Sequence, residues 1–144
     1  MKYAFRDVEF MSARQKRLVL NAWVRFLKNG LRFQDFSDRL YWHFILHCSF
    51  IAHHDRAGFY RTYFENGEDT ARFLFEFDKR GEFRLVEYGP SWWFSRDYED
   101  INGAMVEEAS GYIPGLREKA QAKAREADLA EARRLAAKHG FQVC

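Results

Sequence analysis

The histidines are the first residues in this sequence whose spacing would allow metal chemistry. Four of the five fall within twelve residues. His43 and His47 are four residues apart, so on a helix they would project from one face and bind a metal ion together. His53, His54 and Asp55 follow and would supply a third ligand if the chain folds back beside that helix. A metal-dependent enzyme is therefore one hypothesis for this chain.

Two observations weaken the metal hypothesis. Phe44 follows the first histidine, at the place where zinc proteases carry a catalytic glutamate. Paired histidines on an otherwise apolar helix are also more often hydrogen-bonded core residues than ligands. We therefore expect no cofactor.

Other catalytic motifs are missing from the sequence. It contains no Gly-x-Ser-x-Gly, no Gly-x-x-x-x-Gly-Lys and no Gly-x-Gly-x-x-Gly. Cys48 adjoins His47, but neighbours in sequence point in different directions on a helix or strand, so they do not pair a nucleophile with a base. The sequence leans against an enzyme.

A row of basic residues lies on the first predicted helix. The steps between its members are three or four residues, which places them along one face. The row contains no acid, so it would follow a phosphate backbone; its simpler interpretation is the outward face of an amphipathic helix. The row consists of Arg14, Arg17, Asn21, Arg25 and Lys28.

Three consecutive aromatic residues follow Gly89-Pro90-Ser91. If Trp92 or Trp93 is exposed, its ring offers a surface for base stacking or for a protein partner. The alternative is that these rings close the core, because Trp is favoured in cores as well as in interfaces.

The charge of the chain is uneven along its length. The net charge is +2, but residues 1–39 carry nine Lys and Arg against four Asp and Glu, and residues 116–144 carry seven against four. The centre is therefore acidic. Basic ends would attract a polyanion or pair with the centre.

Helical periodicity and capping residues predict the helices. Ser12 and Gln15 form a capping-box pattern before the first helix, which ends at Asn29-Gly30. A second helix runs from Ser37 to His47 and, being apolar almost all round, is expected to be central and buried. Residues 68–80 form a third helix, with acids at its start and Gly81 past its end. Helices over 95–111 and 116–139 follow.

Aromatic and β-branched residues predict three strands. Residues 49–54 and 59–64 are interpreted as a hairpin around Gly58, with continuation of the second helix to His54 as the alternative. Residues 83–88 form the third strand. The fold class is therefore α+β: an N-terminal helical pair, a small three-stranded sheet with a crossover helix, and two C-terminal helices.

The last helix is long and rich in alanine. Its 24 residues would span about 36 Å, and eight of them between 120 and 137 are Ala. Residues 1–115 are expected to form one compact domain, and residues 116–144 an extended helix of the same domain that packs on it only in part.

These features lead to three functional hypotheses. The first is a non-enzymatic interaction or accessory protein that binds a protein partner or itself through the C-terminal helix and an aromatic surface. The second is a nucleic-acid-binding accessory protein that uses the basic row, and the third is the metal enzyme. No apolar stretch is long enough for a membrane span, and two unpaired cysteines fit a cytoplasmic location.

Overall fold

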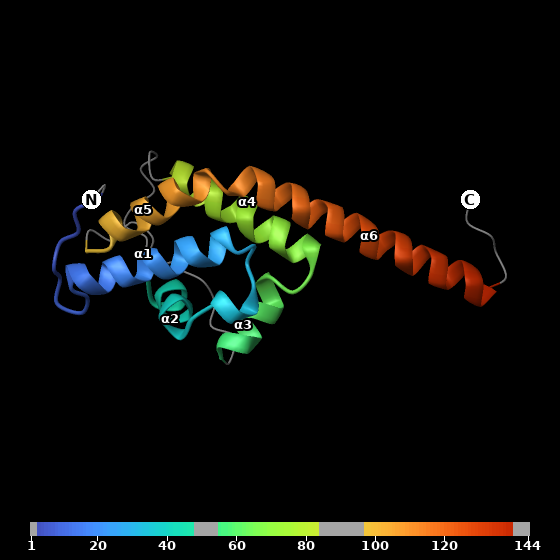
Figure 1. Cartoon of the computed structure of the whole chain (residues 1–144), viewed down its shortest axis with the longest axis horizontal. Coiled ribbons are helices and arrows are strands. Elements are labelled where there is room, and N and C mark those ends of the chain that lie inside the picture. The colour runs from blue at the N-terminus through green and yellow to red at the C-terminus, as the bar shows by residue number, and fades with distance from the viewer. Residues whose placement is uncertain (1–2, 48–54, 84–96, 140–144) are drawn as a thin grey trace.

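The computed structural model describes residues 3–47, 55–83 and 97–139, without the side chains of residues 79–83 and 139. Over these ranges the chain forms six α-helices and one short 3-10 helix, and no strand (Figure 1). The elements are α1 (Ala13–Lys28), η1 (Phe33–Asp35), α2 (Asp38–His47), α3 (Arg56–Tyr63), α4 (Gly67–Phe83), α5 (Glu99–Ser110) and α6 (Ile113–His139). The expected α+β fold with a three-stranded sheet is wrong, because the described chain is helical.

The predicted strand over residues 59–64 is a helix. Asp55 caps α3 by accepting a hydrogen bond from the backbone N–H of Gly58 at 2.7 Å. The aromatic residues that suggested a strand pair at helical spacing instead: the rings of Phe59 and Tyr63 lie 4.6 Å apart. Strand preference of aromatic residues reflects packing on a half-buried surface rather than a fixed backbone preference, so burial in a helical core reverses it.

The other two predicted strands, residues 49–54 and 83–88, lie almost wholly outside the described residues. Residues 49–54 and 84–88 lie outside the described residues, and Phe83 is the last residue of α4. The crossover between parallel strands nevertheless fails, because one of its two strands is α3.

Local capping signals at helix starts were read correctly. The Ser12 hydroxyl accepts from the backbone N–H of Gln15, and the Gln15 side chain accepts from the backbone N–H of Ser12. This reciprocal pair satisfies two N–H groups that a helix start leaves without partners. The predicted helix at residues 68–80 is also confirmed, with Glu68 and Asp69 in the first turn of α4, but its predicted end before Gly81 is wrong, because α4 continues to Phe83.

The core is built from aromatic side chains around α1. Trp23 is fully buried, and its indole N–H donates to the carbonyl oxygen of Met105 at 2.9 Å. Phe26, Phe36 and Phe44 are also fully buried. The central helix is therefore α1. The expectation that the second helix would be the central, buried one is wrong, because α2 exposes Trp42 and Leu46.

The helix α6 packs on α4 and then continues past it. Figure 1 shows α6 running beside α4 and beyond the other helices toward the C-terminus. Gly67 fits closely against α6: a Cβ atom there would overlap the carbonyl oxygen of Ala120 and lie 2.7 Å from the backbone nitrogen of Ala124. In the described part of the chain, no helix is long and apolar enough to cross a membrane.

A pair of glycine substitutions tests this contact. Gly67→Ala should lower the free energy of unfolding by about 1–3 kcal/mol, because the added methyl group meets backbone atoms that cannot move aside. Gly115→Ala is the matched control, since nothing lies within 4 Å of its Cβ position. It should leave stability unchanged or raise it by up to about 1 kcal/mol. Equal effects in urea unfolding would contradict the close packing of α4 on α6.

Candidate functional site

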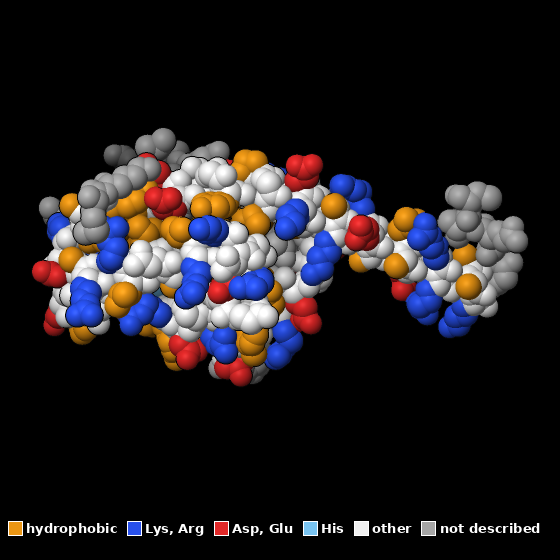
Figure 2. Space-filling model, in the orientation of Figure 1, with side chains coloured by type: hydrophobic (Ala, Val, Ile, Leu, Met, Phe, Trp, Pro, Cys, Tyr) orange, Lys and Arg blue, Asp and Glu red, His pale blue; other side chains and the backbone are white. Residues whose placement is uncertain are grey.

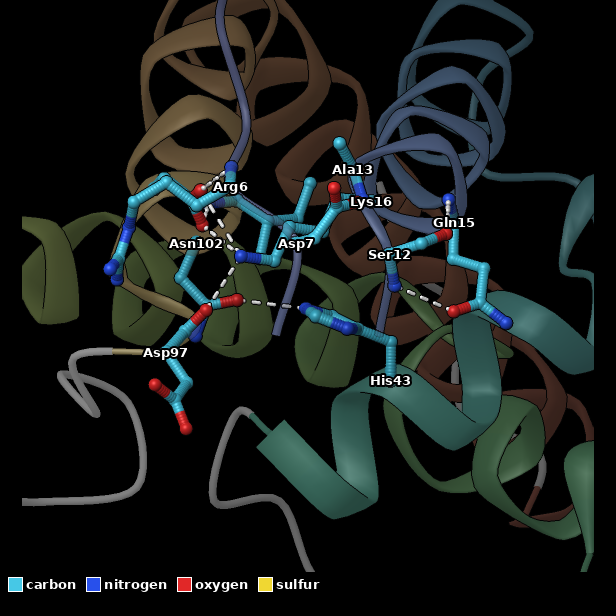
Figure 3. Close-up of polar contacts among 11 residues, drawn as sticks. Arg6, Asp7, Ser12, Ala13, Gln15, Lys16, His43, Asp97 and Asn102 are labelled. Atoms are coloured by element: carbon cyan, nitrogen blue, oxygen red, sulfur yellow. Dashed lines mark hydrogen bonds and ion pairs between the residues drawn. The ribbon is translucent and has the colours of Figure 1, made fainter. Parts of the chain in front are cut away.

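A buried lysine is the most unusual feature of the interior. Lys16 lies on the apolar face of α1, and its side chain has no exposed surface. Its ammonium group donates to both carboxylate oxygens of Asp100, at 2.8 and 3.1 Å, and to the carbonyl oxygen of Asp97 at 2.7 Å. Figure 3 shows Lys16 beside Asp97. A buried ammonium group requires this pairing, because desolvation of an unpaired charge is very costly.

The carboxylate of Asp100 is adapted to this role. Burial raises its pKa. The hydrogen bonds from Lys16 and from the backbone N–H groups of Arg6 and Ile101 lower the pKa by more than burial raises it, so the pKa lies below its usual value. Asp100 therefore stays ionised beside the ammonium group and joins α5 to α1.

The two histidines of α2 lie next to this ion pair. His43 is buried, and its Nε2 lies 2.8 Å from Oδ1 of Asn102 (Figure 3). Because the amide nitrogen of Asn102 donates to the carbonyl oxygen of His47 at 2.9 Å, Oδ1 is the acceptor and His43 donates from Nε2. His47 stacks on the ring of Tyr98, with centroids 3.8 Å apart. We call these groups the polar cluster: Lys16, His43, His47, Tyr98, Asp100 and Asn102.

Both histidines are neutral in this setting. Burial lowers the pKa of His43 to about 3; the charge of Lys16, and that of His47 whenever it is protonated, also lower it, whereas the hydrogen bond with Asn102 raises it. Burial likewise lowers the pKa of His47. Nδ1 of each histidine is buried without a hydrogen-bond partner among the described residues.

The predicted metal ligands are brought together only in part. His43 and His47 share a face of α2, with ring centroids 5.3 Å apart. Asp55 caps α3, and His53 and His54 lie outside the described residues. In the described ranges no three His, Cys, Asp or Glu side chains form a group that could hold a metal ion. The Lys16 ammonium group beside the histidines also disfavours a second cation, so the geometry gives this hypothesis little support.

The ion pair and the His43–Asn102 hydrogen bond connect α1, α2 and α5. An ammonium group has no lone pair for nucleophilic attack, and the hydrogen bonds of Lys16 direct its protons to the oxygens of Asp97 and Asp100. The cluster therefore acts as a polar clamp inside the helical body.

The basic row on α1 is on the surface, but its members differ. Arg14 and Lys28 are exposed, whereas Arg17 is partly buried, donating to the carbonyl oxygen of Tyr3 at 2.7 Å and lying over the ring of Phe5. Arg25 is 3.8 Å from a carboxylate oxygen of Asp35. A surface hollow is lined by four members of the row, Arg17, Asn21, Arg25 and Lys28, and not by Arg14.

The predicted aromatic surface cannot be located. Trp92 and Trp93 lie outside the described residues. The apolar surface that the structure does show on α2 is formed by Trp42 and Leu46, which are four residues apart and about half exposed.

The sequence did not predict the polar cluster around Lys16. It also did not predict that a basic residue of α6 lies near the basic row of α1. Lys16 precedes Val19, Leu20 and Trp23 by three, four and seven residues, so its place on the apolar face was visible from the periodicity. Lys119 of α6 lines a surface hollow together with Lys28 of α1, and this could not be predicted because it depends on how distant helices pack.

The second half of α6 is the most exposed helical segment. Every residue from 125 to 138 is exposed except Ala136. Leu129 and Leu135 are 45% and 41% exposed. We call residues 125–138 the projecting section; Figure 1 shows it extending away from the other helices.

Comparison with known proteins adds no functional assignment. No family model matches the chain, and neither the curated proteins nor the solved structures contain a match.

A substitution in the ion pair tests the polar clamp. Asp100→Asn keeps the shape of the side chain but leaves the buried ammonium group of Lys16 without its counter-charge. Because the Asp100 side chain is 20% exposed, we expect the free energy of unfolding to fall by about 2–3 kcal/mol, less than for a fully buried pair. Glu131→Gln is the control, since it makes the same chemical change in an exposed ion pair with Arg134. It should change stability little; similar losses would show that the Lys16 pair is not a clamp.

The pH dependence of stability tests the buried histidine. In the unfolded chain a histidine binds a proton below about pH 6.5, whereas folded His43 remains neutral down to about pH 3. The unfolded state therefore binds more protons in this window, and stability should fall with decreasing pH, by up to about 1.4 kcal/mol per pH unit. His43→Gln retains a donor for Asn102 but cannot titrate, so urea unfolding should give it a smaller slope between about pH 6 and 4. Identical slopes would contradict the burial of His43.

Proposed function

We propose that this protein is a non-enzymatic binding protein that associates with another polypeptide through the projecting section of α6. The observation that carries the proposal is the exposure of residues 125–138. This continuous stretch of helix contains two nearly half-exposed leucines, several alanines and charges of both signs. The interior supports it, because the Lys16 ammonium group is committed to structural contacts.

The energetics of the projecting section favour a partner. An isolated helix of this length is marginally stable in water, because most helical stability in proteins comes from packing against other elements. The ion pair between Glu131 and Arg134, at 2.6 Å, is exposed and adds little. A partner that covers Leu129 and Leu135 would therefore both bury apolar surface and stabilise the helix.

The first half of α6 indicates the chemistry of the partner. There, Ala120 and Ala124 allow α4 to approach so closely that only glycine fits at position 67. In the projecting section Ala127 follows Ala120 by seven positions, so it continues the same small-residue face of the helix. We infer that the partner presents an α-helix with small and apolar residues at the contact.

Charge gives a second requirement for this partner helix. The projecting section carries both signs, with Glu126, Asp128 and Glu131 among Arg125, Arg133, Arg134 and Lys138. A partner that carries charges of both signs around its apolar contact would complement this pattern. The exposed Trp42 and Leu46 of α2 are a separate apolar surface and are not needed for this contact.

We also propose a reducing, cytoplasmic location. Cys48 and Cys144 are the two cysteines of the sequence. Two cysteines do not make the dense disulfide framework that is typical of small secreted domains, which favours a reducing compartment.

Site-specific photo-crosslinking tests the association. A photoreactive phenylalanine analogue replaces Ala132 in the full chain, and Gln34, which is exposed in η1, is the control position. We expect crosslinks from position 132 to a helical segment of a second polypeptide, identified by mass spectrometry. Equilibrium sedimentation shows whether that polypeptide is a second copy or a different protein.

A double substitution then separates a specific contact from chance proximity. Leu129→Asp with Leu135→Asp should weaken the association at least about tenfold, as loss of central apolar contacts does in other interfaces. Phe10→Asp with Leu18→Asp makes the same change at two exposed apolar residues outside α6 and should have no effect. A strictly monomeric chain with no crosslinks above the level at position 34 would contradict the proposed function.

A further inference from the structure

We propose that a basic groove formed by α1 and the first half of α6 binds the sugar–phosphate backbone of a nucleic acid without reading its sequence. This proposal is independent of the protein association, because it uses neither Leu129 nor Leu135. It extends the part of the basic row that lines a hollow, which excludes Arg14, by residues that lie about ninety positions later in the chain.

The groove consists of three adjacent surface hollows: the first lies along α1, the second at the turn after α1, and the third between that turn and α6. Neighbouring hollows have lining residues in common. Lys28 and Asn29 line both the first and the second hollow. Gly30, Leu116 and Lys119 line both the second and the third. The hollows therefore follow the outer face of α1, pass the turn after it and reach α6.

The turn in the middle of the groove has a defined backbone. Gly30 and Leu31 both have positive φ angles, 83° and 63°, and the backbone N–H of Leu31 donates to the carbonyl oxygen of Phe26 at 2.8 Å. Burial of the Leu31 side chain holds this less favoured conformation in place. The end of α1, which carries Lys28, is thus held against the core.

The residues that line the groove are strongly biased to positive charge. Glu108 is the one acid among them. Figure 2 shows Lys and Arg side chains gathered over α1 and the first half of α6. The cations of the groove are Arg17, Arg25, Lys28, Lys119 and Lys123.

Most of these cations can still meet a ligand. Lys28 and Lys119 form no ion pair with another described residue and are exposed. Arg25 keeps three quarters of its side chain exposed despite Asp35 at 3.8 Å. Lys123 donates to the carbonyl oxygen of Glu65, a neutral group that leaves its charge uncompensated. Arg17 donates its hydrogen bond to the carbonyl oxygen of Tyr3, so it attracts phosphates only through the electrostatic field of its charge.

The arrangement fits a chain of phosphates better than a single anion. The cations do not converge on one point: Arg25 and Lys28 are separated by about 4.5 Å along α1, and Lys119 and Lys123 by about 6 Å along α6. Spaced charges neutralise successive phosphates and release their counterions.

Fluorescence anisotropy of the full chain tests the groove. A fluorescein-labelled single-stranded oligodeoxynucleotide and its duplex are titrated at several salt concentrations. With four cations available, log Kobs should fall with log salt at a slope of about −3 for the single strand and about −4 for the duplex. Oligonucleotides of unrelated sequence should bind equally well.

Charge reversal locates the binding surface. Lys28→Glu with Lys119→Glu should reduce the magnitude of the salt slope by about 2 and weaken binding at low salt. Arg14→Glu with Arg39→Glu is the control: it changes the net charge by the same amount, and neither residue lines the groove. Circular dichroism checks that both variants remain folded. The control should keep the wild-type slope.

Three results would overturn the groove proposal. The first is no saturable binding of either oligonucleotide at low salt. The second is equal weakening in the groove variant and its control, which would indicate a response to net charge alone. The third is binding to vesicles that contain phosphatidylserine but not to oligonucleotides. Leu129→Asp with Leu135→Asp should bind oligonucleotides normally, so failure of one proposal does not imply failure of the other.

Discussion

The ammonium group of Lys16 is the constraint on which the helical body depends. It has no contact with water, so the helix that carries it must stay beside the carboxylate of Asp100 and the carbonyl oxygen of Asp97. This fixes α1 against α5 on one side of the aromatic core, and the His43–Asn102 hydrogen bond fixes α2 beside them. Because one face of α1 is committed to the core, its basic face must point outward.

The helix α6 connects the interior to both proposed binding surfaces. Its first half packs on α4 through Ala120 and contributes Lys119 to the groove, while its second half is exposed as far as the described residues show. One continuous helix therefore carries both of the surfaces that we propose, one for phosphates in its first half and one for a protein partner in its second. A partner on the arm and a nucleic acid in the groove would be held in a fixed relation by the helix itself.

The sequence was informative about local structure and less so about long-range packing. The capping box at Ser12 and the acidic start of α4 predicted helices correctly, because these signals act over one turn, whereas Gly81 did not end α4. The aromatic residues 59–64 misled, because their strand preference depends on a sheet that the fold does not provide. Lys16 pairs with Asp100, and Lys28 lines the same groove as Lys119. Both contacts join segments more than 80 residues apart, so no local pattern encodes them.

Hydrogen–deuterium exchange followed by mass spectrometry tests the central claim most directly, namely that the interior is fixed and the projecting section is free to bind. In the dilute chain, backbone amides of α1 and α5 should exchange slowly, whereas those of residues 125–138 should exchange at nearly the rate of an isolated helix. Crosslinked complexes should show protection confined to that section. Uniformly slow exchange along the whole of α6 in the dilute monomer would mean that the section packs on its own chain, and would contradict the account.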